Sequence, residues 1–416
     1  MLVACAGCTD PPLDAVSDSG MASWTSDPGA VETTATMDVQ DVTVSPPEVA
    51  TDVTPDVAPA DPWGPALAAT VTVDGQLAVR GTYRGVEADL ALDTGASGTT
   101  LAKWLAVDAG GGEGELRLGP ITGTQQFSVQ DLAEADAFLG VRIGALVGPD
   151  VLGLRPWVVF DWTTRSVHFP DALPPDPLMA SWPFKLTNNI PVVDVDVGAA
   201  GTIKLIADTG SGVTVLTASI WQKLVAAAPK KPPERNGYVW KTLYGNTPAA
   251  VVRVPELALG SPKLTVSGSW AIVVPDESAF VKFLASLGLP KGFVGFPVYR
   301  RFRLAFSVKE SRYVLLPKPS DPAPANEWTR VGLEVSWRPD GFPVEWVYKQ
   351  TSAEAEGVVA GDRLVSIDAQ AVAGQSLAAV RALLGGTPGE TRVLGLTRAG
   401  KPVTATVQVE DLLPVQ

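Results

Sequence analysis

Two stretches decide the fold: residues 86–97, VEADLALDTGAS, and residues 201–212, GTIKLIADTGSG. Each is an apolar, strand-like run that leads into Asp-Thr-Gly and then into a turn of small residues. A short helix-like segment follows each of them, at 101–105 and at 219–224. Because both copies show the same features in the same order, a duplicated unit is the simplest interpretation.

Two further sequence features occur in both halves of the chain. An apolar run ends at Gly148 in the first half of the chain and at Gly295 in the second. Each run is followed by an Arg-marked strand pair rich in aromatic side chains, at 154–161 and at 299–306. The shared order of these landmarks predicts two β-rich lobes of one design.

Composition favours β structure and argues against nucleic-acid binding. Val, Thr and Gly are abundant, and 46% of the chain is apolar, which is enough for sizeable cores. The net charge is −13, but eleven of the 45 acidic residues lie between Asp10 and Asp61, ahead of the first basic residue, Arg80. The remainder has 34 acids against 32 bases. No basic patch is evident there, so we expect no nucleic-acid partner.

Histidine and cysteine chemistry is limited by how few of these residues there are. The single histidine, His168, lies in an alternating segment that predicts an ordinary strand residue, although one histidine could also serve a Ser or Cys nucleophile. The only cysteines, Cys5 and Cys8, lie at the N-terminus. We therefore expect neither a disulfide nor a thiolate metal site in the folded part, and no cofactor.

The N-terminus resembles the end of a bacterial lipoprotein signal. LVAC at residues 2–5 fits a lipobox with Cys5 as the lipidated residue, while Cys8 fits less well. The basic start and apolar stretch of a signal are missing, so an accidental similarity stays open. Residues 9–63 predict a disordered acidic Pro/Thr tether, because they cannot bury enough apolar surface to fold. The resemblance implies a lipid anchor in the bacterial cell envelope, facing the periplasm or the cell exterior.

Residues 64–316 resemble the pepsin and retropepsin aspartic proteases. The resemblance rests on the two Asp-Thr-Gly motifs and on the apolar runs ending at Gly148 and Gly295, which in that family pass beneath the Asp loops. It implies that Asp93 and Asp208 are catalytic. The residues that it assigns to support of the catalytic loops are Thr94, Gly95, Ser97, Thr209 and Gly210.

Two carboxyl groups can hydrolyse a peptide bond without a metal, Ser or Cys. Held close together they share one proton, because their repulsion lets only one ionise early. The ionised carboxylate activates a water, and the protonated carboxyl polarises the scissile carbonyl and then protonates the leaving nitrogen. Ser97 can donate a hydrogen bond to Asp93, whereas Gly212 offers none to Asp208. Asp93 is therefore expected to be the base and Asp208 the acid.

Some family features are missing. The first apolar run continues into Asp150, but the second continues into Pro297 and lacks that acid. No Tyr lies between Asp93 and Gly148, where pepsin-like enzymes carry a flap tyrosine. The flap candidates are Thr122 and Gly123 in the first lobe and Tyr244 and Gly245 in the second. These departures leave open a catalytically silent peptide-binding or scaffold protein with a duplicated retropepsin-like fold.

A third block resembles a PDZ domain. Residues 355–368, AEGVVAGDRLVSID, carry the resemblance. It implies that the block captures peptide ends by adding a strand to a sheet edge. The expected peptide-binding loop is Gly332, Leu333, Glu334 and Val335. The block could instead serve only as a packing module.

Together these patterns predict a mainly β chain with a two-lobed pepsin/retropepsin-like acid-protease barrel pair and a C-terminal PDZ domain. The expected boundaries are a truncated lipoprotein signal at 1–8, a linker at 9–63, lobes at 64–180 and 181–316, a Pro-rich linker at 317–326 and the PDZ domain at 327–413. The expected function is an aspartic endopeptidase acting on peptides or proteins, with a C-terminal peptide as PDZ ligand. Both aspartates lie in one chain, so a monomer is expected to be active.

Overall fold

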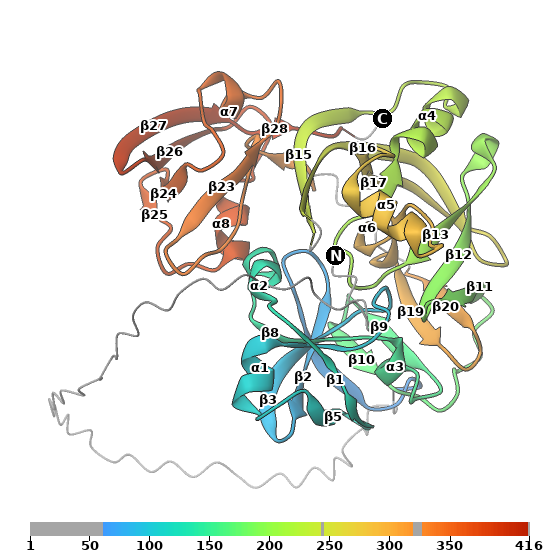
Figure 1. The fold of residues 1–416 in the computed structure, drawn as a ribbon. Coiled ribbons are helices and arrows are strands. Elements are labelled where there is room, and N and C mark those ends of the chain that lie inside the picture. Colours follow the sequence, from blue (N-terminus) through green and yellow to red (C-terminus); the bar gives the residue numbers. More distant parts are fainter. Residues whose placement is uncertain (1–60, 243–244, 319–326, 415–416) are drawn as a thin grey trace, which may run out of the picture. The chain divides into compact units, whose positions relative to one another are not determined.

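Strands dominate the computed structural model, which describes residues 61–242, 245–318 and 327–414 (Figure 1). Lobe 1, residues 61–179, opens with a hairpin whose register pairs Val71 with Leu77. Gly75 adopts a φ of 88° in its turn, a conformation that glycine reaches without strain. The elements of lobe 1 are β1 (Ala66–Val71), β2 (Leu77–Tyr83), β3 (Val86–Leu92), β4 (Thr100–Ala102), α1 (Lys103–Asp108), β5 (Glu113–Leu118), β6 (Ile121–Gln126), β7 (Ser128–Gln130), α2 (Ala133–Leu139), β8 (Ile143–Val147), α3 (Pro149–Leu152), β9 (Val158–Asp161) and β10 (Ser166–His168).

Lobe 2, residues 180–318, repeats the strand pairing of lobe 1. Its elements are β11 (Ala180–Thr187), β12 (Ile190–Asp196), η1 (Gly198–Ala200), β13 (Thr202–Ala207), β14 (Val215–Thr217), α4 (Ala218–Ala227), β15 (Glu234–Thr242), β16 (Gly245–Leu259), β17 (Leu264–Val274), α5 (Ala279–Ser286), β18 (Phe293–Val294), α6 (Phe296–Tyr299), β19 (Phe302–Ser307) and β20 (Arg312–Pro317). β3 lies between antiparallel β2 and parallel β8, as β13 lies between antiparallel β12 and parallel β18. The predicted duplication is therefore visible in the topology as well as in the sequence.

One antiparallel sheet joins the two lobes. Its strands follow the order β1, β10, β9, β19, β20 and β11, so it takes three strands from each lobe. The buried face of this sheet contributes Phe160 and Phe306 to a core shared by the two lobes. The lobes are thus one folded body, which fixes the strands that carry the two Asp-Thr-Gly motifs.

The C-terminal domain, residues 327–414, is a small β domain with two helices. Its elements are β21 (Thr329–Arg330), β22 (Leu333–Val335), β23 (Phe342–Val347), α7 (Ser352–Ala355), β24 (Arg363–Ile367), β25 (Gln370–Ala371), α8 (Leu377–Leu383), β26 (Thr391–Arg398), β27 (Lys401–Gln408) and β28 (Glu410–Asp411). Its own core packs β22 and β23 against α8, with Leu333, Val344 and Val380 among the buried side chains. The mainly β fold class with two lobes and a third domain is confirmed.

The C-terminal domain also shares a hydrophobic cluster with lobe 2. Trp328, Trp346 and Tyr348 are buried in the cluster that contains Trp240 and Trp270 of lobe 2. The rings of Trp270 and Trp328 meet edge to face, with centroids 5.0 Å apart. This is an attractive aromatic geometry, so the domain packs tightly on lobe 2 despite the Pro-rich sequence that precedes it.

The strand assignment of His168 is confirmed. Its ring is buried in β10, where Nε2 lies 3.0 Å from the Ser166 hydroxyl and Nδ1 lies 3.1 Å from the Gly64 carbonyl oxygen. Both ring nitrogens are thus used in the sheet that joins the lobes. The histidine has a structural role there.

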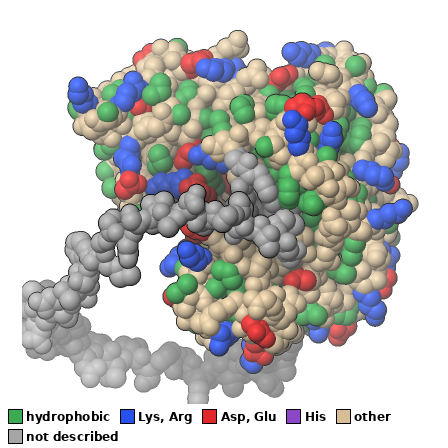
Figure 2. Space-filling view, in the orientation of Figure 1, with side chains coloured by type: hydrophobic (Ala, Val, Ile, Leu, Met, Phe, Trp, Pro, Cys, Tyr) green, Lys and Arg blue, Asp and Glu red, His purple; other side chains and the backbone are tan. Residues whose placement is uncertain are grey.

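Positive and negative side chains are mixed on the face of the molecule that Figure 2 shows. In Figure 2, Lys and Arg side chains are interspersed with Asp and Glu rather than gathered into a basic patch. Among the described residues, no helix is both long and apolar enough to span a membrane. Cys5, Cys8 and most of the predicted 9–63 tether lie outside the described residues.

Candidate active site

Asp93 and Asp208 each stand at the end of a central strand. The main-chain N–H of Asp93, after β3, donates to the carbonyl oxygen of Val147 in β8 at 2.9 Å. The N–H of Asp208, after β13, donates to the carbonyl of Val294 in β18 at 3.0 Å. The apolar runs that end at Gly148 and Gly295 therefore lie beside the Asp loops, as the sequence predicts.

Four hydrogen bonds of Thr94 and Thr209 lock the two loops together. The Thr94 hydroxyl accepts from the Thr209 N–H at 3.1 Å and donates to the Ala207 carbonyl at 3.0 Å. The Thr209 hydroxyl accepts from the Thr94 N–H at 3.1 Å and donates to the Leu92 carbonyl at 2.9 Å. Both hydroxyls are fully used in buried positions, so the loops are rigidly positioned.

Gly95 and Gly210 bring each carboxyl group against the opposite loop. A Cβ added to Gly95 would lie 2.3 Å from Cγ of Asp208, and one added to Gly210 would lie 2.2 Å from Cγ of Asp93. Neither position has room for a side chain. Each glycine also donates its N–H to the aspartate of its own loop, at 2.9 Å and 2.8 Å. Glycine is required here by close approach to the reacting groups.

The two carboxyl groups form one electrostatic unit. Asp93 is 1% exposed and Asp208 is 0% exposed. Burial raises the pKa of both, and the charge of Asp208 and a hydrogen bond with it further raise the pKa of Asp93. Two buried carboxyl groups in contact cannot both ionise easily, so the pair holds a proton at pH values where an exposed aspartate would have lost it.

Main-chain donors around the two aspartates bear on their expected division of roles. Ser97 was expected to favour the ionised form of Asp93, and Gly212 to leave Asp208 without an equivalent donor. Instead, the main-chain N–H groups of Gly210 and Ser211 both lower the pKa of Asp208, whereas Gly95 alone does so for Asp93. A hydrogen bond to the charged form favours that form. Main-chain donors at Asp208 thus offset the hydroxyl that Gly212 lacks, and the order in which the two carboxyl groups ionise stays a prediction.

A second threonine in each lobe supports the loops, and the sequence comparison missed it. The hydroxyl of Thr99 accepts from the N–H of Gly148 at 3.0 Å, and that of Thr214 accepts from Gly295 at 3.3 Å. Each threonine lies six residues after its aspartate, so the repeat Asp-Thr-Gly-x-x-x-Thr was a usable signal. In lobe 1 Asp150 binds the Thr99 hydroxyl and N–H, at 2.8 and 3.0 Å.

The flap candidates have different surroundings in the two lobes. Thr122 and Gly123 lie in β6, and a Cβ on Gly123 would meet Val151 at 3.5 Å and Leu154 at 3.4 Å. They thus lie beside α3, and a flap role for them stays a prediction. In lobe 2, β15 and β16 form a hairpin that corresponds to the shorter β5–β6 hairpin of lobe 1. Tyr244 lies outside the described residues, and Gly245 opens β16.

A cavity of about 570 Å³ adjoins the second Asp loop. Its wall includes Gly212 and Val213, which follow that loop, and the aromatic side chains of Phe138, Tyr238 and Trp346. Trp346 stacks on Phe138 with centroids 6.3 Å apart and tilts against Tyr238 at 4.7 Å. Residues of both lobes and of the C-terminal domain thus line this cavity, whose wall also carries charged side chains such as Asp74, Glu134 and Lys241.

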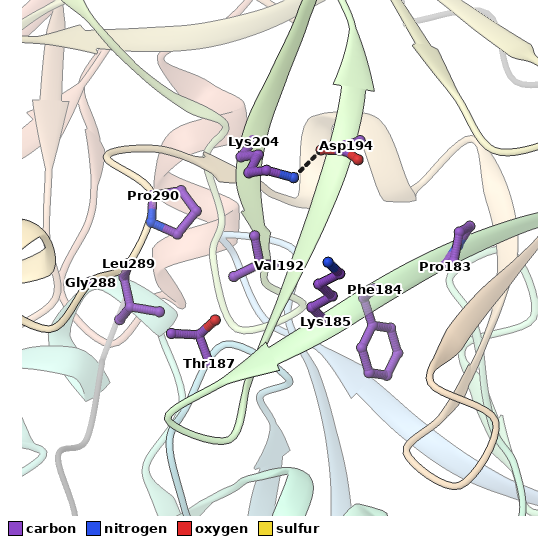
Figure 3. A pocket seen from close by; sticks show the side chains of 10 residues that line it. All are labelled: Pro183, Phe184, Lys185, Thr187, Val192, Asp194, Lys204, Gly288, Leu289 and Pro290. Carbon is purple, nitrogen blue, oxygen red and sulfur yellow. Dashed lines mark hydrogen bonds and ion pairs between the residues drawn. The ribbon is translucent and has the colours of Figure 1, made fainter.

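A second cavity, of about 600 Å³, lies in lobe 2 away from the Asp loops. Figure 3 shows it between β11, β12 and β13, beside residues 288–290, with the Lys204–Asp194 ion pair in view. Both ionic side chains are more than half exposed. An exposed, solvated ion pair of this kind is common on protein surfaces, so it does not indicate a catalytic or binding role for this cavity.

Comparison with known proteins identifies the third block. Residues 329–409 match the family model of the PDZ domain. Residues 329–409 form a PDZ domain. No curated protein matches the chain. Among solved structures, the crystal structure of aspartic proteinase from Irpex lacteus is similar at 15% identity and a TM-score of 0.39, over 63% of this chain and 99% of that chain.

The predicted peptide-binding loop of the PDZ domain is buried. Gly332 precedes β22, and Leu333, Glu334 and Val335 form that strand; all four are buried. On one side β22 pairs with β23, and on the other it faces α8. PDZ domains bind peptides by adding a strand to a sheet edge, and β22 is the strand for which the sequence predicts that role.

Proposed function

We propose that the chain is an aspartic endopeptidase whose catalytic groups are Asp93 and Asp208. The observation that carries the proposal is the mutual placement of the two Asp-Thr-Gly loops. Each glycine leaves room only for the carboxyl group of the opposite loop, and two threonines hold this arrangement through four buried hydrogen bonds. A β protein with coincidental turns would have no reason to pair two buried carboxyl groups, because the pairing costs stability.

The mechanism follows from the unequal donors around the pair. Asp208, with two main-chain donors, is ionised and removes a proton from a water molecule. Asp93, protonated, donates a hydrogen bond to the scissile carbonyl oxygen while the water oxygen bonds to the carbonyl carbon. The Asp93 proton passes to the carbonyl oxygen, which gives a tetrahedral diol. Asp208, which now carries the proton from water, gives it to the leaving nitrogen as the C–N bond breaks, and a diol hydroxyl returns a proton to Asp93. The products are a carboxylic acid and an amine. The pair again shares one proton at the end.

The other parts of the chain fit a secreted, anchored protease. Both aspartates lie in one chain and the lobes share one core, so the proposed active form is a monomer. We retain lipidation at Cys5 and residence in the bacterial cell envelope as proposals that rest on the N-terminal sequence alone. The PDZ domain is the proposed site for a peptide or protein partner.

A peptide-library digest across pH tests the proposal. The intact protein is expected to cleave internal peptide bonds, and Asp93→Asn to lose at least about a thousandfold in rate, since removal of a catalytic acid or base in a cooperating pair has effects of that size. Asp340→Asn is the matched control, because Asp340 is exposed and pairs with Arg363 within the PDZ domain. Cleavage by Asp93→Asn at the rate of the control would exclude the dyad.

A further inference from the structure

The PDZ groove is crossed by an ion pair. Arg381 of α8 reaches Glu334 of β22, with Nε and Oε1 2.6 Å apart. Arg381 also donates to the main-chain carbonyl of Val335 at 3.5 Å. These contacts join the two walls of the groove along the line where an added peptide strand would run. The groove is therefore closed by contacts that a peptide must replace.

The turn between β1 and β2 of lobe 1 contacts this PDZ groove at Arg381. Asp74 accepts a hydrogen bond from Nη1 of Arg381 at 3.0 Å, so the arginine is shared between a PDZ residue and a protease-lobe residue. Val73, beside it, packs against the hydrophobic core of the PDZ domain. An aliphatic side chain next to a carboxylate is the chemistry that a PDZ groove with a cationic wall can accept.

The other end of the same turn reaches the catalytic loops. The side-chain amide of Gln76 donates to the main-chain carbonyl of Gly210. Gly210 itself lies against the Asp93 carboxyl group, so Gln76 is anchored directly beside the two aspartates. The approach of Asp74 is so close that a Cβ on Gly212 would lie 2.6 Å from its carbonyl oxygen. Asp74 and Gln76 of the turn also line the cavity that adjoins the second Asp loop.

A second set of contacts holds lobe 1 against the PDZ domain nearby. The N–H of Trp337 donates to the carbonyl of Ala137 in α2 at 2.9 Å, and Arg338 makes a bidentate pair with Glu134 at 2.8 and 2.9 Å. Val73 also donates its N–H to Leu139 of α2 at 3.0 Å. The turn and α2 are therefore fixed together on the PDZ surface.

We propose that residues 73–76 are an internal ligand of the PDZ groove and block the substrate cleft while they are bound there. A peptide that ends in an aliphatic residue with a free carboxylate competes for the groove, because its carboxylate replaces Asp74 at Arg381 and its side chain replaces Val73. Release of the turn withdraws Gln76 from Gly210 and opens the cleft. The blocking half of this inference rests on the proposed endopeptidase function, whereas the internal-ligand half does not.

Hydrogen exchange tests the internal ligand without any need for activity. Asp74→Asn keeps the shape of the side chain and removes its charge, and Asp74 is only half-buried, so the variant is expected to fold. In Asp74→Asn, we expect the main-chain N–H groups of Val73 and Gln76 to exchange at least tenfold faster than in the intact protein. The control, Asp340→Asn, removes an ion pair within the PDZ domain and is expected to change neither amide. Equal protection in all three proteins overturns the proposal.

The competitor arm uses a synthetic hexapeptide that ends in Val-COOH, with its C-terminal amide as the control. The free acid is expected to accelerate exchange at 73–76 in the full-length protein, and the amide to have no such effect. Equal effects of acid and amide, or none, overturn the competition. In the library digest, Asp74→Asn is expected to cleave at least threefold faster than Asp340→Asn. Faster exchange with unchanged cleavage overturns the block, and faster exchange with no cleavage by any form keeps the internal ligand but contradicts the endopeptidase.

Discussion

Asp93 and Asp208 illustrate how a reactive site costs stability at the scale of single residues. Burial is the largest cause of the raised pKa of each carboxyl group. A raised folded-state pKa means that the native protein holds protons more tightly than the unfolded chain does. The stabilisation is complete below the unfolded-state pKa and is lost as pH rises through the folded-state pKa. At neutral pH the dyad therefore weakens the fold relative to acid.

Asp93→Asn is predicted to be more stable than the intact protein at pH 7 and about equal to it at pH 3. The amide removes one of two repelling carboxyl groups, and each pKa unit of upward shift corresponds to about 1.4 kcal/mol. Urea denaturation at the two pH values measures the difference. If Asp93→Asn showed no gain in stability over the intact protein at pH 7, the assignment of two repelling carboxyl groups would be contradicted.

Glu327 is predicted to hold the PDZ domain to lobe 2 through charge. It makes a bidentate pair with Arg300 at 2.7 and 2.8 Å and accepts from the indole of Trp270 at 2.7 Å. Glu327→Gln should cost about 3–5 kcal/mol, because a buried arginine is left without its partner. Glu310→Gln, which removes an exposed pair with Arg312, should cost under about 1 kcal/mol. Equal urea midpoints for the two variants would refute this role.

At the scale of elements, most of the candidate site could be predicted from the sequence, but the packing of the β1–β2 turn against it could not. The Asp-Thr-Gly loops, the runs before Gly148 and Gly295 and the strands between them were predictable, because each is a local pattern of apolar residues and turn glycines. Gly212 was interpreted as a missing hydroxyl. The structure shows that it is a steric requirement of the β1–β2 turn, which is 138 residues away in sequence at Asp74. Such a contact leaves no local signal.

Gly212→Ala is predicted to displace the β1–β2 turn. Its Cβ would lie 2.6 and 2.7 Å from Asp74 atoms, and overpacking of this kind costs about 1–3 kcal/mol. Gly123→Ala is the matched control, since its Cβ would make only ordinary contacts of 3.4 Å or longer. Thermal unfolding of both variants, with exchange at Gln76 as a local probe, distinguishes them. A Gly212→Ala protein as stable and as protected as the control would rule out the close approach.

At the scale of the whole molecule, the PDZ domain shares a hydrophobic core cluster with lobe 2. The Pro-rich linker predicted at 317–326 is typical of a boundary between separable domains. The indole and phenol rings of Trp328, Trp346 and Tyr348 instead complete a core cluster of lobe 2. Sequence patterns identify which side chains are apolar, but they do not tell which domain buries them.

Truncation after residue 318 is therefore predicted to destabilise the two lobes. It exposes the cluster around Trp240 and Trp270, and the loss of a single buried Trp already costs about 3–5 kcal/mol. The urea midpoint of the truncated protein should fall well below that of the full chain, with increased binding of a hydrophobic dye. A truncated protein with an unchanged midpoint would show that the PDZ domain is independent after all.

The central claim is that Asp93 and Asp208 hydrolyse peptide bonds as one proton-sharing pair. The most direct test is the pH dependence of kcat/KM for a peptide selected by the library digest, measured on the intact protein and on Asp93→Asn. The account predicts a bell-shaped profile, since one carboxyl must be ionised and the other protonated, and a loss of at least about a thousandfold in the variant at every pH. Activity that survives in Asp93→Asn with the same profile would contradict it.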